Sequence, residues 1–480
     1  MQVFVYKKAV LIWKIRAFFY FTFNAMGLYL PLTQIKTGFM KRKIIILTVV
    51  ILITGSGMQA QEDNTWTLEE CIAYALEQNI TVRKTGLSNQ SLEYQASQLK
   101  AQRFPSASAS LGQTFNWSRS DGTDPDEGDI VSSNGSNYGI NTQVNLFSGS
   151  RLSNQIRQSV LDIEGGKYNL ETTKESISLS ILNAFLQILY AQEQVKNSEK
   201  QIESTTEQLN LAGERLTLQV IAMTDYLQVK SQLASEKLTL ANANSQLAIS
   251  RVNLMQLMEL PVTDSFMIAQ PILDAELNQN RTSDVQGVYG TALSIKPQIK
   301  YAAINKEIAA LDEKIARAGY FPSISANASL SSAFSGKSYD PYFDQLDLSS
   351  RAAVGFTLAI PIYQNKQIKT SIALAKIGYQ NAELSETDTR NQLRKNIEQA
   401  SLDVTSAQIE YEASLEKYQA TLETSNLSDE RFTQGIINSV DYLVTKTNLI
   451  VAESQLLQSK YRLIFSYKIL DFYLGIPLSL

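Results

Sequence analysis

The chain has 480 residues, a formal net charge of −4, a single cysteine and no histidine. The absence of histidine excludes His-based acid–base catalysis, Ser-His-Asp and Cys-His nucleophiles and most zinc sites, and the acidic balance argues against a nucleic-acid-binding surface. No glycine-rich phosphate loop is present either, so we predict a protein that is not an enzyme and uses no cofactor and no metal.

The first 60 residues have the pattern of an export signal. Met40 is followed by a basic segment, the apolar run 44–53 and small residues, and cleavage after Ala60 fits a secretory signal peptide. The run is too short to span a bilayer comfortably. We interpret residues 1–39 as an over-extended gene start, with a membrane-proximal extension as the alternative. Without residues 1–60 the chain has 35 basic and 47 acidic residues, a net charge near −12.

From residue 61 onward the chain consists of two similar halves. A tetrapeptide and a tripeptide of the first half return 216 positions later: Glu214-Arg215-Leu216-Thr217 and Asp225-Tyr226-Leu227 become Glu430-Arg431-Phe432-Thr433 and Asp441-Tyr442-Leu443. This spacing exceeds the 20 to 50 residues of a solenoid unit. We therefore predict two domain-sized repeats, residues 61–285 with a trailing linker and residues 286–480.

The only cysteine lies in an apolar helical pattern near the start of the first repeat. Leu68, Cys71, Ile72 and Ala75 recur at the spacing of one helix face. We expect Cys71 to be a small buried hydrophobe, and no intramolecular disulfide is possible.

Each repeat then contains two segments in which apolar and polar residues alternate. They cover residues 106–117 and 137–146 in the first repeat, and 323–330 and 354–360 in the second. A strict period of two over about ten residues is typical of transmembrane β-strands, although half-buried soluble hairpins show it too. The intervening segments 121–135 and 335–349 are polar, as exposed hairpin loops are.

Four strands cannot form a barrel alone. Small barrels need about eight strands, and an open edge in lipid would leave backbone groups without hydrogen bonds. If the strands lie in a membrane, several chains must share one barrel. The alternation and the export signal therefore predict an oligomer.

Long helices follow the strands in both repeats. No proline occurs between residues 126 and 260 or between 362 and 476, so uninterrupted helices are permitted there. From about Leu152 to Thr217, small residues recur every seven positions beside larger apolar ones, which is typical of closely packed coiled coils. A 65-residue helix would reach about 100 Å. Gly165-Gly166 predicts a kink or a loosened turn.

A second helix returns along the first in each repeat. Heptad stripes begin at Tyr226 and at Tyr442, so each repeat is predicted to be a helical hairpin with its tip near residues 218–224 or 434–440. On the helices alone, an ordinary coiled-coil spacer is an equally good interpretation.

Several of these motifs, in order and twice, resemble the TolC-like outer-membrane efflux protein family (outer membrane factor). The segment from Trp66 to Asn79 resembles the family's opening helix, and Arg103-Phe104-Pro105 and Tyr320-Phe321-Pro322 its passage into the first strand of each repeat. Asn365-Lys366 stand where the family usually has two glycines. The resemblance covers most of residues 66–477.

The resemblance implies a mixed α+β membrane protein. Three chains, with four strands each, would form a twelve-stranded β-barrel in the outer membrane, continuous with a long periplasmic α-helical coiled-coil barrel. The family's homotrimers serve as passive exit ducts for small molecules that an inner-membrane transporter expels through a periplasmic adaptor (membrane fusion protein). The type I protein-secretion exit channel is the main alternative, and a periplasmic coiled-coil structural protein with soluble hairpins is a further one.

The family's gate and adaptor-docking site lie at the hairpin tips. By resemblance, the gate candidates are Asp225, Asp441, Arg431 and Phe432, and the docking candidates are Leu218, Gln219, Val220, Gln434, Gly435 and Ile436. The first tip has Gln219 in place of the family's glycine, so we expect its turn to differ. Three copies of Asp441 around an axis would attract cations. A helix-capping role for both aspartates is the alternative, compatible with the first.

Overall fold

The computed structural model describes residues 65–119, 130–263, 266–271 and 284–480. The predicted signal peptide, the start at Met40 and the segment 1–39 lie outside the described residues. The stretch Thr65–Leu480 is one compact unit.

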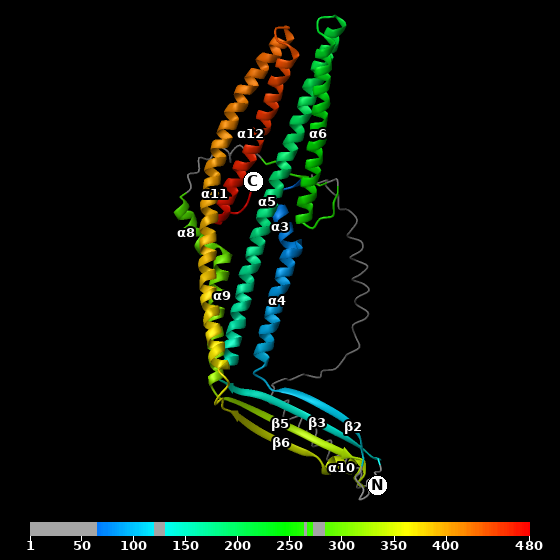
Figure 1. Ribbon diagram of the computed structural model, residues 1–480, viewed down its shortest axis with the longest axis vertical. Helices are drawn as coiled ribbons and strands as arrows, with labels where there is room; N and C mark the ends of the chain where they lie inside the picture. The colour runs from blue at the N-terminus through cyan, green and yellow to red at the C-terminus, as the bar shows by residue number, and fades with distance from the viewer. Residues whose placement is uncertain (1–64, 120–129, 264–265, 272–283) are drawn as a thin grey trace, which may run out of the picture. The chain divides into compact units, whose positions relative to one another are not determined.

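The first repeat runs through two short helices, two strands and two long helices (Figure 1). Its elements are β1 (Thr65–Trp66), α3 (Leu68–Gln78), α4 (Ile80–Ala101), β2 (Ser106–Arg119), β3 (Ile130–Ser148), α5 (Arg151–Thr217) and α6 (Met223–Leu257). The second repeat follows the same order after β4 (Met267–Ile268): α8 (Val285–Ile295), α9 (Pro297–Arg317), a 3-10 turn (Ala318–Tyr320), β5 (Ser323–Ser335), α10 (Tyr342–Leu348), β6 (Arg351–Ala359), α11 (Gln367–Thr433) and α12 (Ser439–Leu474). The predicted duplication is therefore visible in the element order.

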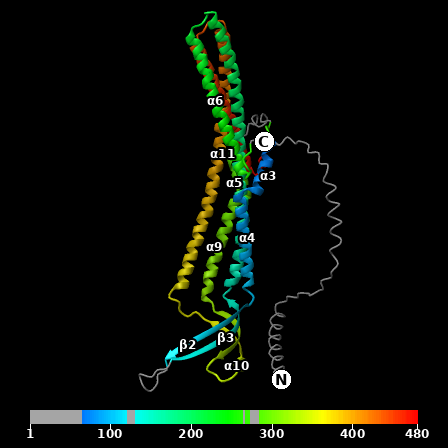
Figure 2. The same ribbon diagram turned by 90° about the vertical axis from the view of Figure 1, so that its right-hand side faces the viewer.

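The helices α5 and α11 are 67 residues long each. At about 1.5 Å per residue they extend about 100 Å, as predicted. In its N-terminal half α5 packs on α4 and α9, and α11 packs on α9 (Figure 2). In their C-terminal halves α5 packs on α6, and α11 packs on α12. Among the residues that the structure describes, no helix combines the length and apolar character needed to cross a bilayer.

Gly165-Gly166 does not loosen α5, which continues through both residues as unbroken helix. The prediction of a kink or loosened turn there was wrong. A Cβ on Gly166 would lie 2.3 Å from Asn89 Oδ1 of α4, and one on Gly165 would touch Ile304 of α9 at 3.4 Å. The two glycines therefore allow α4 and α9 to approach α5 closely from two sides.

The spaced small residues of α5 form the contact surface along its C-terminal half. Ala191, Ser198, Thr205 and Ala212 are all buried, each at most 8% exposed. At the equivalent positions of α11, Ala407 and Ser428 are buried, and Ser414 and Thr421 are half-buried. The predicted close helix approach is confirmed.

The larger apolar core in the described residues combines side chains of α3, α5, α6 and α12. Phe185 and Leu254 are almost completely buried in it together with Cys71. Helix α3 starts with a capping box, in which Thr67 Oγ1 accepts from the Glu70 amide at 3.2 Å and the Glu70 carboxylate accepts from the Thr67 amide at 3.0 Å. This cap places the apolar face of α3 on the long helices, and Cys71 is buried as predicted.

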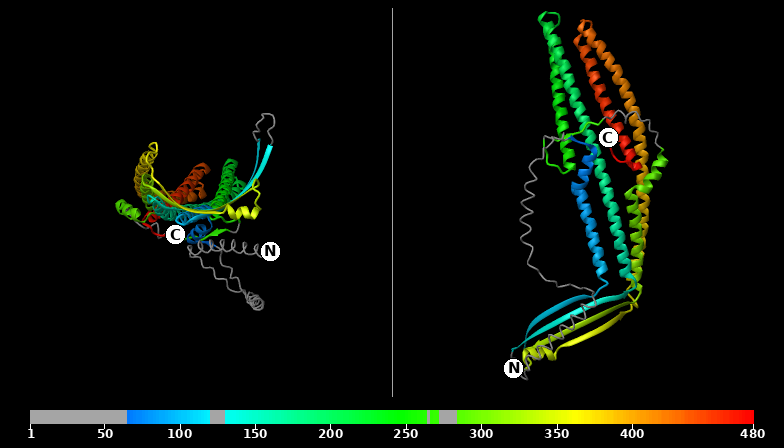
Figure 3. Two further views of the ribbon diagram at one scale, coloured as in Figure 1. Left: turned by 90° about the horizontal axis from the view of Figure 1, so that it is seen from below. Right: turned by 180° about the vertical axis from the view of Figure 1, so that it is seen from behind.

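The four long strands form one bent antiparallel sheet in the order β2-β3-β5-β6 (Figure 3). All four strands are longer than predicted. Strands β2 and β3, for example, pair from Ser106↔Gln143 to Arg119↔Ile130. Apolar residues line up across strands, as in Ala109↔Ile140↔Leu330 and Ala326↔Phe356. The alternation thus gives the sheet one apolar face.

That apolar face is exposed in the single chain. Leu111 and Trp117 of β2 are 80% and 71% exposed, and Val354 and Phe356 of β6 are 77% and 74% exposed. Since β2 and β6 are the end strands of the described sheet, each also has an unpaired edge. Apolar surface on this scale marks contact with lipid or another protein.

Two local predictions about the strands need correction. Leu146 was expected to continue the apolar face of β3, but a register irregularity between Asn145 and Phe147 places Phe147 opposite Ile324 instead. The segment 335–349 was expected to be a plain loop, yet it contains α10, which packs on β5 through Gln345. The Gln345 side chain accepts from the Ser335 amide at 2.9 Å.

The turn from strand to long helix explains why glycines suit this position. Gly149 and Ser150 precede α5 with φ of 61° and 65°, and Asn365 and Lys366 precede α11 with φ of 45° and 61°. This left-handed region costs an ordinary residue about 1–2 kcal/mol. The second repeat makes the turn without glycine, and asparagine is among the residues that best tolerate it.

The burial of Cys71 yields a direct test of the larger core. Burial, reinforced by Glu70 and Glu69, raises the pKa of the Cys71 thiol to about 12. The thiolate is the reactive form, so native protein at pH 8 is expected not to react with iodoacetamide, and denatured protein is expected to react fully. Mass spectrometry of the labelled chain measures this. Cys71→Ala combined with Ser245→Cys, an exposed position, is the reactive control, and labelling of native Cys71 at the control's rate would contradict the packing.

Candidate functional site

The tip of the first hairpin is a tight turn between α5 and α6. The Val220 amide donates to the Arg215 carbonyl at 2.9 Å and the Gln219 amide to the Leu216 carbonyl at 3.0 Å. Gln219 supplies the left-handed residue, with φ of 55°. These bonds satisfy the last carbonyls of α5 in the way a Schellman motif does.

The second tip makes the same turn. The Ile436 amide donates to the Arg431 carbonyl at 2.9 Å and the Gly435 amide to the Phe432 carbonyl at 3.1 Å, with Gly435 at φ of 73°. The expectation that Gln219, in place of glycine, changes the first turn was therefore wrong. The hydrogen bonds of the turn outweigh the cost of placing a glutamine in the left-handed region.

The predicted docking residues form the outermost part of both tips. Leu218 and Val220 are 73% and 69% exposed, and Ile436 is 66% exposed. Gln219, Gln434 and Gly435 are exposed beside them. Each tip therefore presents apolar side chains to its surroundings.

Both predicted gate aspartates lie in the first turn of a returning helix. Asp225 Oδ2 accepts from the Ala222 amide at 3.3 Å. The Asp441 amide donates to Asn438 Oδ1 at 2.8 Å, and Asp441 Oδ2 accepts from Asn438 Nδ2 at 3.0 Å. Both therefore stabilise a helix start, but from the third helical position, since Ala222 and Asn438 are the N-cap residues.

One arginine connects the two hairpins near their tips. The Arg215 guanidinium of α5 donates to the Phe432 carbonyl at 3.0 Å and to the Thr433 carbonyl, both at the end of α11. It also lies 5.9 Å from the centre of the Phe432 ring. We call this set of contacts the inter-hairpin clamp.

The clamp rests on a stacked aromatic pair. The Phe432 and Tyr442 rings stack with centroids 4.4 Å apart and an angle of 13° between their planes. Tyr442 is completely buried, and burial, with Asp429 and Glu236 nearby, raises the pKa of its hydroxyl. Phe432 thus contacts both Arg215 and the core of its own hairpin.

Charged and amide side chains surround this aromatic pair. Lys446 Nζ of α12 lies 3.1 Å from Asp429 Oδ2 of α11, which joins the second hairpin. In the first hairpin the buried Glu236 of α6 accepts from Gln201 of α5 at 3.3 Å. Within the described residues its second oxygen, Oε2, has no hydrogen-bond partner. An unsatisfied buried oxygen is costly, so the Glu236 carboxylate destabilises the packing beside the aromatic pair.

Sequence resemblance indicated Arg431, whereas the structure shows Arg215 in the bridging position. The two arginines are equivalent in the repeats, but the Arg431 side chain is exposed. Resemblance alone does not show which of the two arginines bridges the hairpins. That depends on how the two hairpin tips lie side by side, which the local sequence does not show. Of the predicted gate residues, the structure brings only Phe432 into the clamp.

Replacing Arg215 is expected to loosen the tips. Arg215→Met removes two charge-assisted hydrogen bonds between the hairpins, so amide exchange in residues 430–438 is expected to accelerate about tenfold. Hydrogen-exchange mass spectrometry measures this. Arg431→Met is the matched control and is expected to leave exchange unchanged; equal effects of the two variants would contradict the clamp.

Comparisons with known proteins agree with this architecture. The family model described as outer membrane efflux protein matches residues 71–259 and again residues 288–475. No curated protein matches the sequence significantly.

Among solved structures, CusC is 17% identical, with 86% of this chain and 94% of that chain covered at a TM-score of 0.72. The CmeC outer membrane channel of Campylobacter jejuni is 16% identical, with 94% of each chain covered at 0.71. The open-state MtrE outer membrane channel of Neisseria gonorrhoeae is 18% identical, with 87% and 91% covered at 0.68. At these identities the likeness shows the fold.

The two family matches correspond to the two repeats and together span more than half of the chain. They confirm the predicted TolC-like fold, the outer-membrane location and the channel function, and they confirm that the protein is not an enzyme. The interpretation as a periplasmic structural protein is therefore set aside. This chain belongs to the outer membrane efflux protein family.

Proposed function

We propose that three copies of this chain form the exit duct of a tripartite pump, through which an inner-membrane transporter expels small molecules by way of a periplasmic adaptor. The observation that carries the proposal is the four-stranded sheet, whose apolar face is exposed and whose two outer edges are unpaired. Such a sheet is stable in lipid only when neighbouring chains complete it.

Three chains satisfy this requirement with twelve strands. In the antiparallel order β2-β3-β5-β6, the end strands run in opposite directions, so β6 of one copy can pair with β2 of the next and continue the antiparallel pattern. Twelve strands leave room for a water-filled interior, since eight strands are just filled by side chains.

The long helices extend the duct away from the membrane. Each chain contributes α5, α6, α11 and α12, with the order across the wall set by the contacts of α11 with α12, α12 with α5, and α5 with α6. Twelve helices from three chains would then surround the path of the solute.

The tips provide the features that a gate requires. The inter-hairpin clamp joins the two hairpins of one chain through Arg215, and the exposed Asp441 contributes one carboxylate per chain. A ring of three carboxylates favours cations and opposes anions. Opening would separate the hairpins at the clamp and leave the aspartates at the aperture.

The exposed apolar residues of the tips suit a protein partner. Each hairpin ends in a small exposed surface. Its residues are Leu218, Gln219 and Val220 in the first hairpin and Gln434, Gly435 and Ile436 in the second. Contiguous apolar patches on a soluble surface mark interaction sites. We propose that the adaptor binds these residues. A crosslinker at Gln434 followed by pull-down would capture the partner, and the identity of that partner would distinguish a small-molecule pump from a type I secretion system.

The membrane position of the sheet predicts opposite outcomes at two adjacent residues. Phe356→Arg places a charge on the lipid side and is expected to cost about 2–4 kcal/mol near the bilayer midplane. Thr357→Arg, on the other face of β6, is expected to be tolerated. Outer-membrane fractionation with heat-modifiable oligomers measures the difference, and equal amounts of both variants in that fraction would contradict the orientation.

The gate proposal predicts a change in ion selectivity. Asp441→Asn keeps a polar side chain in the first turn of α12 but removes its charge, so the channel is expected to lose part of its cation preference. Single-channel recording in planar bilayers measures the reversal potential, with Asp225→Asn as the comparison from the other tip. Unchanged selectivity in Asp441→Asn would leave only the helix-stabilising role.

A further inference from the structure

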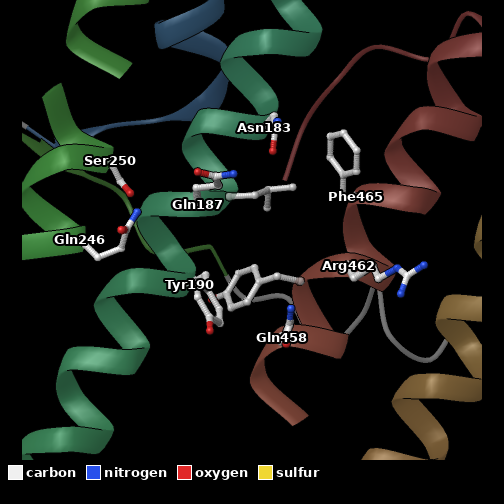
Figure 4. Close-up of a pocket in the computed structure, with 10 residues that line it drawn as sticks. Asn183, Gln187, Tyr190, Gln246, Ser250, Gln458, Arg462 and Phe465 are labelled. Carbon is white, nitrogen blue, oxygen red and sulfur yellow. The ribbon is translucent and has the colours of Figure 1, made fainter. Parts of the chain in front are cut away.

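A pocket of about 380 Å³ lies between α5, α6 and α12, in the wall formed by the long helices (Figure 4). Side chains from all three helices converge on it. Its volume is within the range of sites that bind drug-sized molecules.

The pocket opens on the side of α5 that is not covered by α3. Ile181, Phe185 and Ile188 of α5 pack in the core that contains α3. Asn183 and Gln187, which line the pocket, are exposed and lie about 150° around the helix from these three residues, at 100° per residue. Leu186 and Tyr461 also line the pocket and belong to that same core. The side of α5 that carries Asn183 and Gln187 is the side that can face a solute path.

The lining is mostly apolar, and all but one of its polar side chains are uncharged. Asn183, Gln187, Gln246 and Gln458 are amides, each with donors and acceptors. The one charged lining residue, Arg462, is paired with Glu410 at 2.6 Å. A charged solute would therefore find no opposite charge free to balance its own.

Aromatic rings supply the apolar part of the pocket. Tyr190 and Tyr461 meet edge to face with ring centroids 6.2 Å apart, and Phe465 lies beside them. Flat ring surfaces next to hydrogen-bonding amides favour a ligand that has a ring and a polar edge.

One buried hydroxyl in the pocket lacks a partner. Ser250 of α6 is 2% exposed, and in the described part of the chain its Oγ has no hydrogen bond. Figure 4 shows Ser250 next to Gln246 at the α6 side of the pocket. An unsatisfied buried hydroxyl gains free energy from any ligand that offers it a hydrogen bond.

We propose that this pocket binds a neutral, ring-containing small molecule with several hydrogen-bonding groups, and so forms a contact site for solute on the wall of the duct. The proposal rests on the proposed function, because that function makes the uncovered helix face part of the solute path.

Binding of chloramphenicol, a neutral nitrobenzene with one amide and two hydroxyls, tests the proposal. Equilibrium dialysis with the labelled compound against the purified full chain in nanodiscs is expected to show one saturable site per chain. Ser250→Ala is expected to weaken binding about 3- to 10-fold through the loss of one hydrogen bond. Gln187→Trp places an indole in the pocket and is expected to abolish binding.

Ser245→Ala provides the matched control, since it makes the same substitution on an exposed part of α6. It is expected to leave the affinity unchanged. The proposal would be overturned if the wild type showed no saturable binding, or if both Ser250→Ala and Gln187→Trp bound chloramphenicol with wild-type affinity. Tighter binding of anionic 4-nitrobenzoate than of chloramphenicol would overturn it too. If the protein conducts ions in bilayers but does not bind chloramphenicol, only the binding-site proposal is contradicted. If it binds chloramphenicol but does not conduct, the proposed duct is contradicted.

Discussion

The hydrogen-bonding requirement of a strand edge in lipid governs this protein. A sheet of four strands in the order β2-β3-β5-β6 leaves two outer edges that no strand of the described residues pairs with. Water would satisfy the backbone groups of these edges in a soluble protein, but the bilayer interior does not. The apolar face that carries Val354 and Phe356 directs the sheet toward lipid, and the edges then require other copies. Assembly, a shared barrel and a duct all follow from that requirement.

The duplication explains how one chain provides pairs of equivalent elements, and the clamp shows where equivalence ends. Arg215 and Arg431 occupy the same repeat position, yet only Arg215 bridges to the other hairpin of its chain. In a ring of six hairpins, contacts within a chain alternate with contacts between chains. In the proposed trimer the two hairpins would therefore meet different neighbours. A closed tip held by unlike contacts could then open in a way that a sixfold-symmetric tip could not.

Patterns with a local physical cause could be predicted from the sequence. The alternation in residues 106–117 and the heptads up to Thr217 depend on period and proline placement, and the structure has strands and a 67-residue helix there. The buried position of Cys71 follows from the same periodicity.

Features that depend on distant contacts could not be predicted in this way. Gly166 was interpreted as a weak point, because the sequence does not show that Asn89 lies against it. The clamp joins residues 217 positions apart, and the pocket needs α12 beside α5 and α6. Gln219 illustrates a different reason, since the hydrogen bonds of the turn overcame its backbone preference.

Crosslinking between chains at the sheet edges tests the central claim most directly. In a Cys71→Ala background, Ser110→Cys on β2 and Thr357→Cys on β6 place thiols on the same face of opposite edge strands. Within one chain the two edges are three strand spacings apart, about 14 Å, so a shorter bismaleimide reacts only between chains. The account predicts covalent dimers and trimers, and nothing larger, on denaturing gels. A product that remains monomeric, with both thiols labelled, would contradict it.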